Sequence, residues 1–134
     1  PVKLASGYAL RITAGDAVAG VAHAFRYKIT STGTSVEAKY YDGVTGKTDI
    51  WVGVTPPDSI YEVQHNTALT QANIGGAYDP VIANGSAVTG LSGCYLNSSG
   101  DGFIVTALVN RSDNEFGAYQ KVRGRFVAAD RQIP

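Results

Sequence analysis

The chain has 134 residues, of which 44% are hydrophobic and 16% charged, with 11 basic and 11 acidic side chains that cancel. This length favours one domain with its own core. A neutral chain lacks the basic bias of typical nucleic-acid binders. The single cysteine excludes an internal disulfide, and no apolar run approaches the roughly 18 residues of a membrane span. We therefore expect a folded protein with neither nucleic-acid nor membrane partners.

Alternation of apolar and polar residues dominates the chain and predicts strands with one buried and one solvated face. The first 14 residues allow two interpretations, an ordinary strand at Tyr8–Ile12 or an arm that becomes ordered on a partner. Further along, we expect alternating strands at 25–29, 36–40, 50–54, 60–64 and 121–126, and a strand covered on both sides at 103–109.

Turn signals such as Asn84-Gly85 separate these segments. Helix has room only at Thr70–Ile74, for one or two turns that the following glycines would stop. The pattern predicts an all-β fold, a compact antiparallel β-barrel or sandwich. We expect one compact unit over residues 1–134. The double proline at 56–57 is a possible seam between an N-terminal β subdomain (1–55) and a C-terminal β-barrel subdomain (58–134).

Motifs for catalysis and metal binding are mostly absent. The Gly-Lys-Thr at 46–48 lacks the glycine five residues earlier that a phosphate loop needs, which favours a hairpin turn. Neither His23 nor His65 has a second histidine or cysteine at zinc-ligand spacing. We interpret His23 as a strand residue and His65 as a polar edge or turn residue. No enzyme, cofactor or metal site is predicted.

Three basic residues, Lys121, Arg123 and Arg125, alternate along the last predicted strand and share one face of it. They allow two interpretations. The face is either an electropositive rim that meets an acidic partner, or a protected edge, since lysine and arginine deter stray strand pairing.

Six segments in a fixed order carry a resemblance to a known family: "GVAHAFRY", "AKYYDGVTG", "SIYEVQHN", "NIGGAYD", "VTGLSGCYLNSS" and "IVTALVNRSDNEFGAYQKVRGRFV". They resemble the small capsid decoration, or cement, proteins of tailed bacteriophages, particularly those of marine and cyanobacterial phages. The likeness covers roughly residues 15 to 127 and rests on the order of the segments. The chain departs from the family after residue 127, where a polar Asn-His segment is common, and at Ser112, where proline is common.

The resemblance implies a non-enzymatic protein on the outer surface of the virion capsid, assembled in the host cytoplasm. Its partners would be the major capsid protein, whose neighbouring subunits it bridges, and further copies of itself, with a trimer favoured. Tyrosines suit such contacts because they bury area and keep a polar tip. The candidate contact residues are Tyr8, Arg11, Tyr61, Tyr78, Tyr119, Lys121, Arg123 and Arg125.

Two alternatives stay open. A carbohydrate-binding module for host adhesion would use exposed aromatics as a sugar platform, with Trp51 and Tyr95 as candidates. A small β-barrel hydrolase would use Asp113 and Glu115 as its acid–base pair, although those residues also have the composition of any solvated loop.

Overall fold

The computed structural model describes residues 1–6, 8–13, 16–38, 47–86, 88–89, 91–97 and 100–132, without the side chains of 47–49. Within these ranges the chain forms three β-sheets and two short 3₁₀ turns, η1 (Gln71–Asn73) and η2 (Ala128–Asp130), and no α-helix. The all-β class predicted from the sequence is confirmed, as is the restriction of helix to one or two turns.

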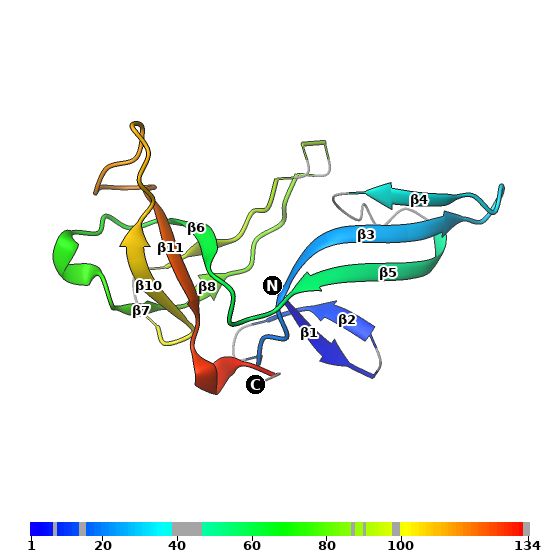
Figure 1. Cartoon of the computed structure of the whole chain (residues 1–134), viewed down its shortest axis with the longest axis horizontal. Helices are drawn as coiled ribbons and strands as arrows, with labels where there is room; N and C mark the ends of the chain where they lie inside the picture. The colour runs from blue at the N-terminus through cyan, green and yellow to red at the C-terminus, as the bar shows by residue number, and fades with distance from the viewer. Residues whose placement is uncertain are drawn as a thin grey trace.

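The largest sheet has six strands that curl into a nearly closed barrel (Figure 1). Their spatial order is β7-β10-β11-β6-β9-β8. The two edge strands, β7 and β8, are separated by a single residue, Asp79, so the chain itself turns the corner between the sheet's edges. The strands are β6 (Tyr61–His65), β7 (Ala77–Tyr78), β8 (Pro80–Val81), β9 (Tyr95–Leu96), β10 (Phe103–Leu108) and β11 (Lys121–Phe126). The β6–β9 pair is parallel, which differs from the all-antiparallel expectation.

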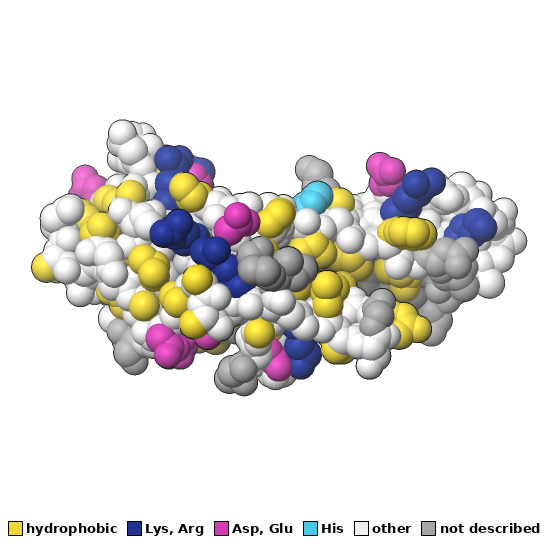
Figure 2. Space-filling view, turned by 60° about the horizontal axis from the view of Figure 1, so that its bottom comes forward, with side chains coloured by type: hydrophobic (Ala, Val, Ile, Leu, Met, Phe, Trp, Pro, Cys, Tyr) yellow, Lys and Arg dark blue, Asp and Glu magenta, His cyan; other side chains and the backbone are white. Residues whose placement is uncertain are grey.

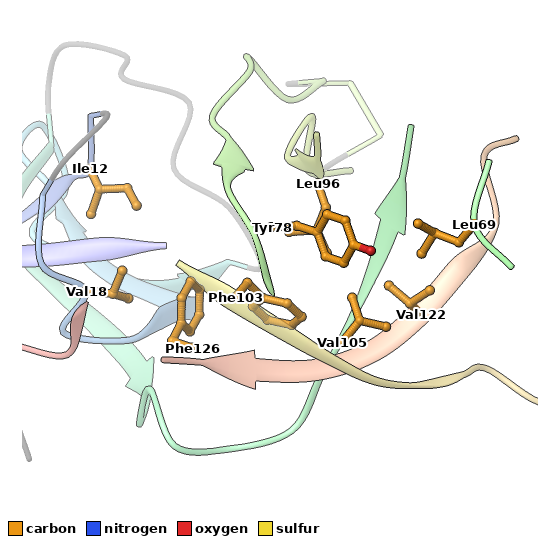
Figure 3. Close-up of a cluster of buried hydrophobic side chains, with 9 residues drawn as sticks. All are labelled: Ile12, Val18, Leu69, Tyr78, Leu96, Phe103, Val105, Val122 and Phe126. Carbon is orange, nitrogen blue, oxygen red and sulfur yellow. The ribbon is translucent and has the colours of Figure 1, made fainter. Parts of the chain in front are cut away.

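The hydrophobic core lies inside this barrel (Figure 3). On β11 the buried positions alternate strictly with exposed ones, as the sequence pattern predicts. Phe126 packs edge to face on Phe103, with ring centroids 5.3 Å apart, and on Tyr61 at 5.7 Å; such pairs contribute about 0.5–1.5 kcal/mol each beyond area burial. The core cluster comprises Ile12, Val18, Leu69, Tyr78, Leu96, Phe103, Val105, Val122 and Phe126.

The expectation that residues 103–109 are covered on both sides is wrong. Phe103 and Val105 are buried, whereas Thr106 and Ala107 are exposed. The pairing of β10 with β11 shifts register between Val105 and Ala107, and such an irregularity bends a strand and redirects its side chains. One face of β10 therefore packs on the core, and the other faces outward.

A second sheet, of three strands in the order β4-β3-β5, extends away from the barrel (Figure 1). Its strands are β3 (Val21–Ile29), β4 (Ser35–Ala38) and β5 (Lys47–Thr55). Its apolar side chains are only half-buried: no residue described in 21–38 or 50–55 reaches the burial of the barrel core. This sheet lacks a second layer in the part of the chain that the structure describes. Residues 39–46, which include the end of the strand predicted at 36–40 and the first residue of the turn predicted at 46–48, lie outside the described residues.

The N-terminal residues form a hairpin of β1 (Val2–Ala5) and β2 (Tyr8–Arg11) and do not extend as an arm. Its strand β2 agrees with the predicted strand at Tyr8–Ile12. The hairpin is tied to the body through Val2, whose N–H donates to the carbonyl of Gly20 at 2.8 Å. Val18 joins the barrel core and donates to the carbonyl of Asp130 at 2.7 Å. Along the chain, the double proline at 56–57 lies between the last strand of the three-stranded sheet and the first strand of the barrel. Val18 precedes these prolines in the sequence but packs in the barrel core.

Candidate functional site

The most strongly charged surface lies on the outer face of β11. Lys121, Arg123 and Arg125 are all exposed there, because the intervening residues point into the core. Figure 2 shows Lys and Arg side chains gathered over the barrel end of the molecule. We call these three residues, together with Arg111, the basic stripe.

One carboxylate serves two arginines of the basic stripe. Glu62 lies opposite Arg123 in the β6–β11 register and accepts from its Nη2 at 3.0 Å and its Nε at 3.2 Å. Its other oxygen accepts from Arg111 Nη2 at 2.8 Å. Exposed ion pairs of this kind contribute at most about 1 kcal/mol, so they orient the arginines more than they stabilise the fold. Glu62 pairs with Arg111 and Arg123, whereas Lys121 and Arg125 form no ion pair among the described residues, so the stripe holds two cations beyond those that Glu62 contacts.

The loop between β10 and β11 is held rigidly beside the basic stripe. The side chain of Asn114 donates to the carbonyls of Val109 at 2.7 Å and Lys121 at 2.8 Å, and accepts from the Lys121 N–H at 2.7 Å. Buried Gln120 donates to the carbonyl of Thr67 at 3.0 Å. These bonds fix the base of the loop, and Tyr119, which directly precedes Gln120, is 64% exposed.

The hollow of the same loop is lined by residues 112–120 and has a volume of about 380 Å³. Asp113 and Glu115, the pair considered for acid–base chemistry, are both exposed on it. Both carboxylates are in contact with solvent in an open loop, and no enclosed cleft surrounds them among the described residues. The geometry favours a solvated loop at this position.

Other predicted contact residues have different environments. Tyr78 is 6% exposed and belongs to the core, and the hydroxyl of half-buried Tyr61 lies within hydrogen-bond reach of the carbonyl oxygens of Thr55 and Pro56. The guanidinium of Arg11 is exposed but held, since it donates to the side-chain oxygen of Asn84 and the carbonyl of Ile82, both at 2.7 Å.

The candidate contact tyrosine on the hairpin, Tyr8, is 70% exposed. Tyr8 therefore remains on the surface with Tyr119, whereas Tyr61 and Tyr78 have structural roles. The tyrosines at 40 and 41 lie outside the described residues.

His65 is not the polar edge residue that the sequence suggests. Its side chain is 0% exposed and packs edge to face on Tyr78, with ring centroids 4.6 Å apart. Nδ1 lies 2.9 Å from the carbonyl oxygen of Thr67, while Nε2 has no hydrogen-bond partner. Burial lowers the pKa of this imidazole below its ordinary value of 6.5.

A second exposed surface lies at the three-stranded sheet. A groove of about 870 Å³ is lined by β2, β3, β4 and β5. Trp51 is 72% exposed on it, and Tyr8 faces it from the hairpin. The described residues of its lining are Tyr8, Arg26, Tyr27, Lys28, Ser35, Ile50 and Trp51.

An acidic hollow of about 180 Å³ lies near the C-terminus and includes Asp79, Asp101 and Asp130. Burial, and then the carboxylates of Asp101 and Asp79, raise the pKa of Asp130. Asp79 Oδ1 already accepts the N–H groups of Asp101 at 3.0 Å and Gly102 at 3.2 Å. Among the described residues no group of three or more His, Cys, Asp or Glu side chains has the geometry of a metal site.

None of the described helical segments is long and apolar enough to cross a membrane. Comparison of the chain with family models, curated proteins and solved structures finds no match in any of the three. The candidate surfaces therefore rest on the geometry of this chain.

Sequence reasoning missed two parts of these surfaces. It did not place Arg111 beside Glu62, because the two residues are 49 positions apart in the chain and no local pattern signals their contact. It named Trp51 but not the basic residues beside it, Arg26 and Lys28. The alternating pattern of residues 25–29 already places those two side chains on one polar face, and that signal was available.

Proposed function

We propose that this chain is a capsid decoration protein of a tailed bacteriophage, which binds the outer surface of the head and links neighbouring major capsid subunits. The order of the six segments supports this proposal at the level of sequence. The structural support is the basic stripe beside the rigid, Tyr119-bearing loop. A decoration protein needs such a preformed surface, because ordering a flexible surface on binding weakens the contact.

The barrel end is the part of the molecule that we assign to the shell. Its rigid loop adds an aromatic side chain to a charged face, and tyrosine and arginine are both enriched in protein interfaces. A contact of standard size buries about 800 Å² per partner. Copies that associate with each other, in a trimer by preference, would each hold one capsid subunit, so that modest single contacts add up to strong retention through avidity.

The neutrality of the chain suits a dense array on a shell. With 11 basic and 11 acidic residues, neighbouring copies do not accumulate the self-repulsion that a large net charge would produce. The positive charge is instead local, at the basic stripe, where it complements an acidic patch on a partner.

The test is co-sedimentation of the purified protein with capsids that lack it, followed by cryo-electron microscopy of the pellet. Saturable binding, with density at fixed positions on the outer shell and the barrel end against it, is the expected result. The variant Lys121→Gln/Arg125→Gln removes two charges from the basic stripe and should weaken binding by about tenfold, a loss of about 1.4 kcal/mol. It should also reduce the dependence on salt, since exposed charges are screened.

A matched control changes the net charge equally at a distant site. Thr30→Glu/Ser31→Glu places two negative charges on the exposed turn that follows β3 and should leave shell binding unchanged. Equal loss in both variants would assign the effect to net charge and not to the stripe. Absence of saturable shell binding by the wild-type protein would refute the proposed function.

A further inference from the structure

Tyr119 has a backbone conformation that tyrosine rarely adopts. Its φ is 62°, in the left-handed region, where the Cβ of an L-residue crowds the following carbonyl oxygen. Among the described residues other than glycine, only Ser6, between β1 and β2, also has a positive φ. The chain uses glycine for similar conformations at Gly33 and Gly75, where φ is 68° and 92°. A tyrosine at position 119 therefore carries strain that glycine or asparagine would avoid.

The side chain of Tyr119 gains little within the molecule that would offset this strain. It is 64% exposed, and its hydroxyl and ring have no hydrogen-bond, aromatic or cationic partner among the described residues. Tyr78 is the contrast, since its ring packs on His65 and its hydroxyl donates to the carbonyl of Asn73 at 3.4 Å. Aromatic residues stabilise a fold mainly through burial, so the fold by itself does not account for tyrosine at position 119.

The residues next to Tyr119 hold its conformation in place. The carbonyl of Gln120 accepts from the N–H of His65 at 2.8 Å. The buried side chain of Gln120 accepts from the Gly117 N–H at 3.2 Å and donates to the carbonyl of Thr67 at 3.0 Å. Strained residues persist only where their surroundings fix them, and they concentrate at binding sites and active sites. Strain, exposure and rigid support together indicate a side chain that is presented to a partner.

The surroundings of Tyr119 suit a protein partner. Phe116, 39% exposed, lines the same hollow of about 380 Å³ in the loop. Lys121 and Arg125, which form no ion pair among the described residues, follow on the exposed face of β11. Tyrosine is enriched among the residues that dominate binding energy at protein interfaces, because its ring fills an apolar pocket while its hydroxyl finds a polar partner. The complementary surface is an apolar pocket beside an acidic patch.

We propose that Tyr119 is the anchor of the shell contact, with its ring in an apolar pocket of the major capsid protein. The left-handed backbone lowers the stability of the free protein and holds the ring ready for this contact. The inference rests on the proposed function, since it names the residue through which the barrel end is held. It has a distinctive consequence, because one substitution should stabilise the free protein and also weaken its binding.

The stability of the free protein tests the strain without any partner. Asparagine and glycine tolerate a positive φ, so Tyr119→Asn and Tyr119→Gly should each raise Tm by about 2–5 °C. The control is Ala118→Gly, since the neighbouring alanine is also exposed but has no positive φ. Glycine there relieves no strain and adds freedom only to the unfolded chain, so Tm should not rise.

Co-sedimentation with capsids that lack the protein, over a series of protein concentrations, tests the anchor. Tyr119→Asn and Tyr119→Gly should weaken binding by about tenfold or more. Tyr119→Phe keeps both the ring and the strain, so it should retain most of the affinity and the Tm of the wild type. The control, Leu91→Ala, removes a 69% exposed apolar side chain outside the hollow of the loop and should bind as the wild type does.

The possible failures are distinguishable. Absence of wild-type binding to capsids would refute the proposed function, and the anchor with it. Equal binding by the wild type and Tyr119→Asn would refute the anchor alone. A Tm that rises in neither Tyr119→Asn nor Tyr119→Gly would refute the strain on which the inference depends. Retained shell binding with loss of self-association in analytical ultracentrifugation would assign the ring to a contact between copies, and would also overturn the proposal.

Discussion

The buried imidazole of His65 predicts a specific dependence of stability on pH. Its side chain is 0% exposed, its Nε2 has no hydrogen-bond partner, and burial lowers its pKa. A charge at this position would be surrounded by the ring of Tyr78 and the apolar core. Protonation of His65 therefore opposes folding.

The sign and size of the effect follow from proton linkage. Below the ordinary pKa of 6.5 the unfolded chain binds a proton at His65 that the folded chain does not. Stability from this residue is therefore fully present above 6.5 and falls as the pH drops toward the lowered folded pKa. The limiting slope is about 1.4 kcal/mol per pH unit, so the loss over the two pH units below 6.5 is at most about 2.8 kcal/mol.

The assay is urea unfolding of the wild type and of His65→Leu between pH 4.5 and 8, compared as a difference in the free energy of unfolding. Leucine fills a similar volume without a titrating group, so the difference should show the slope of the wild type alone. His23→Leu, at an exposed position on β3, is the control for loss of a histidine. Parallel pH profiles for the wild type and His65→Leu would refute the reasoning.

Two further predictions concern the fold. Gly124→Ala should lower the free energy of unfolding by about 1–3 kcal/mol or more, because a Cβ there overlaps the Ile104 carbonyl oxygen and the Phe103 ring. Chemical denaturation measures this loss. Gly117→Ala is the control, since its new carbon has nothing within 4 Å. Hydrogen bonds from Lys3, and then from Thr13, lower the pKa of Asp16 to about 2. The contribution of the ionised Asp16 to folding stability is therefore present above pH 3.8 and is lost as the pH falls toward 2. Its carboxyl resonance in an NMR titration should show that pKa, and Lys3→Met should return it toward 3.8; an unchanged pKa in Lys3→Met would contradict the role of that lysine.

The strands were predictable where alternation is strict. On β11 and β6 the hydrophobic period of two identifies the element and its buried face, because neighbouring side chains on a strand point to opposite sides. The same rule placed Lys121, Arg123 and Arg125 on one outer face. The short 3₁₀ turn η1 followed from its flanking glycines.

Long-range pairing was not predictable from local pattern. The parallel contact of β6 with β9, the shift of register at Val105 and the burial of His65 all depend on which strands meet. The exposure of the β3–β4–β5 sheet was equally unpredictable, because it too depends on which elements pack together. Its alternation predicts a dry face, but a dry face forms only where another layer covers it.

Composition and alternation by themselves therefore determined the class of fold, most strand positions and the charged face of β11, since these depend on neighbours within a few residues. Only the tertiary structure decided that Tyr61 and Tyr78 are structural while Tyr8 and Tyr119 are exposed. It also brought Arg111 to Glu62, and Tyr8 to the groove of Trp51. The physical reason is that burial and proximity between distant segments are properties of the closed barrel and the packed hairpin, and no short stretch of the chain encodes them alone.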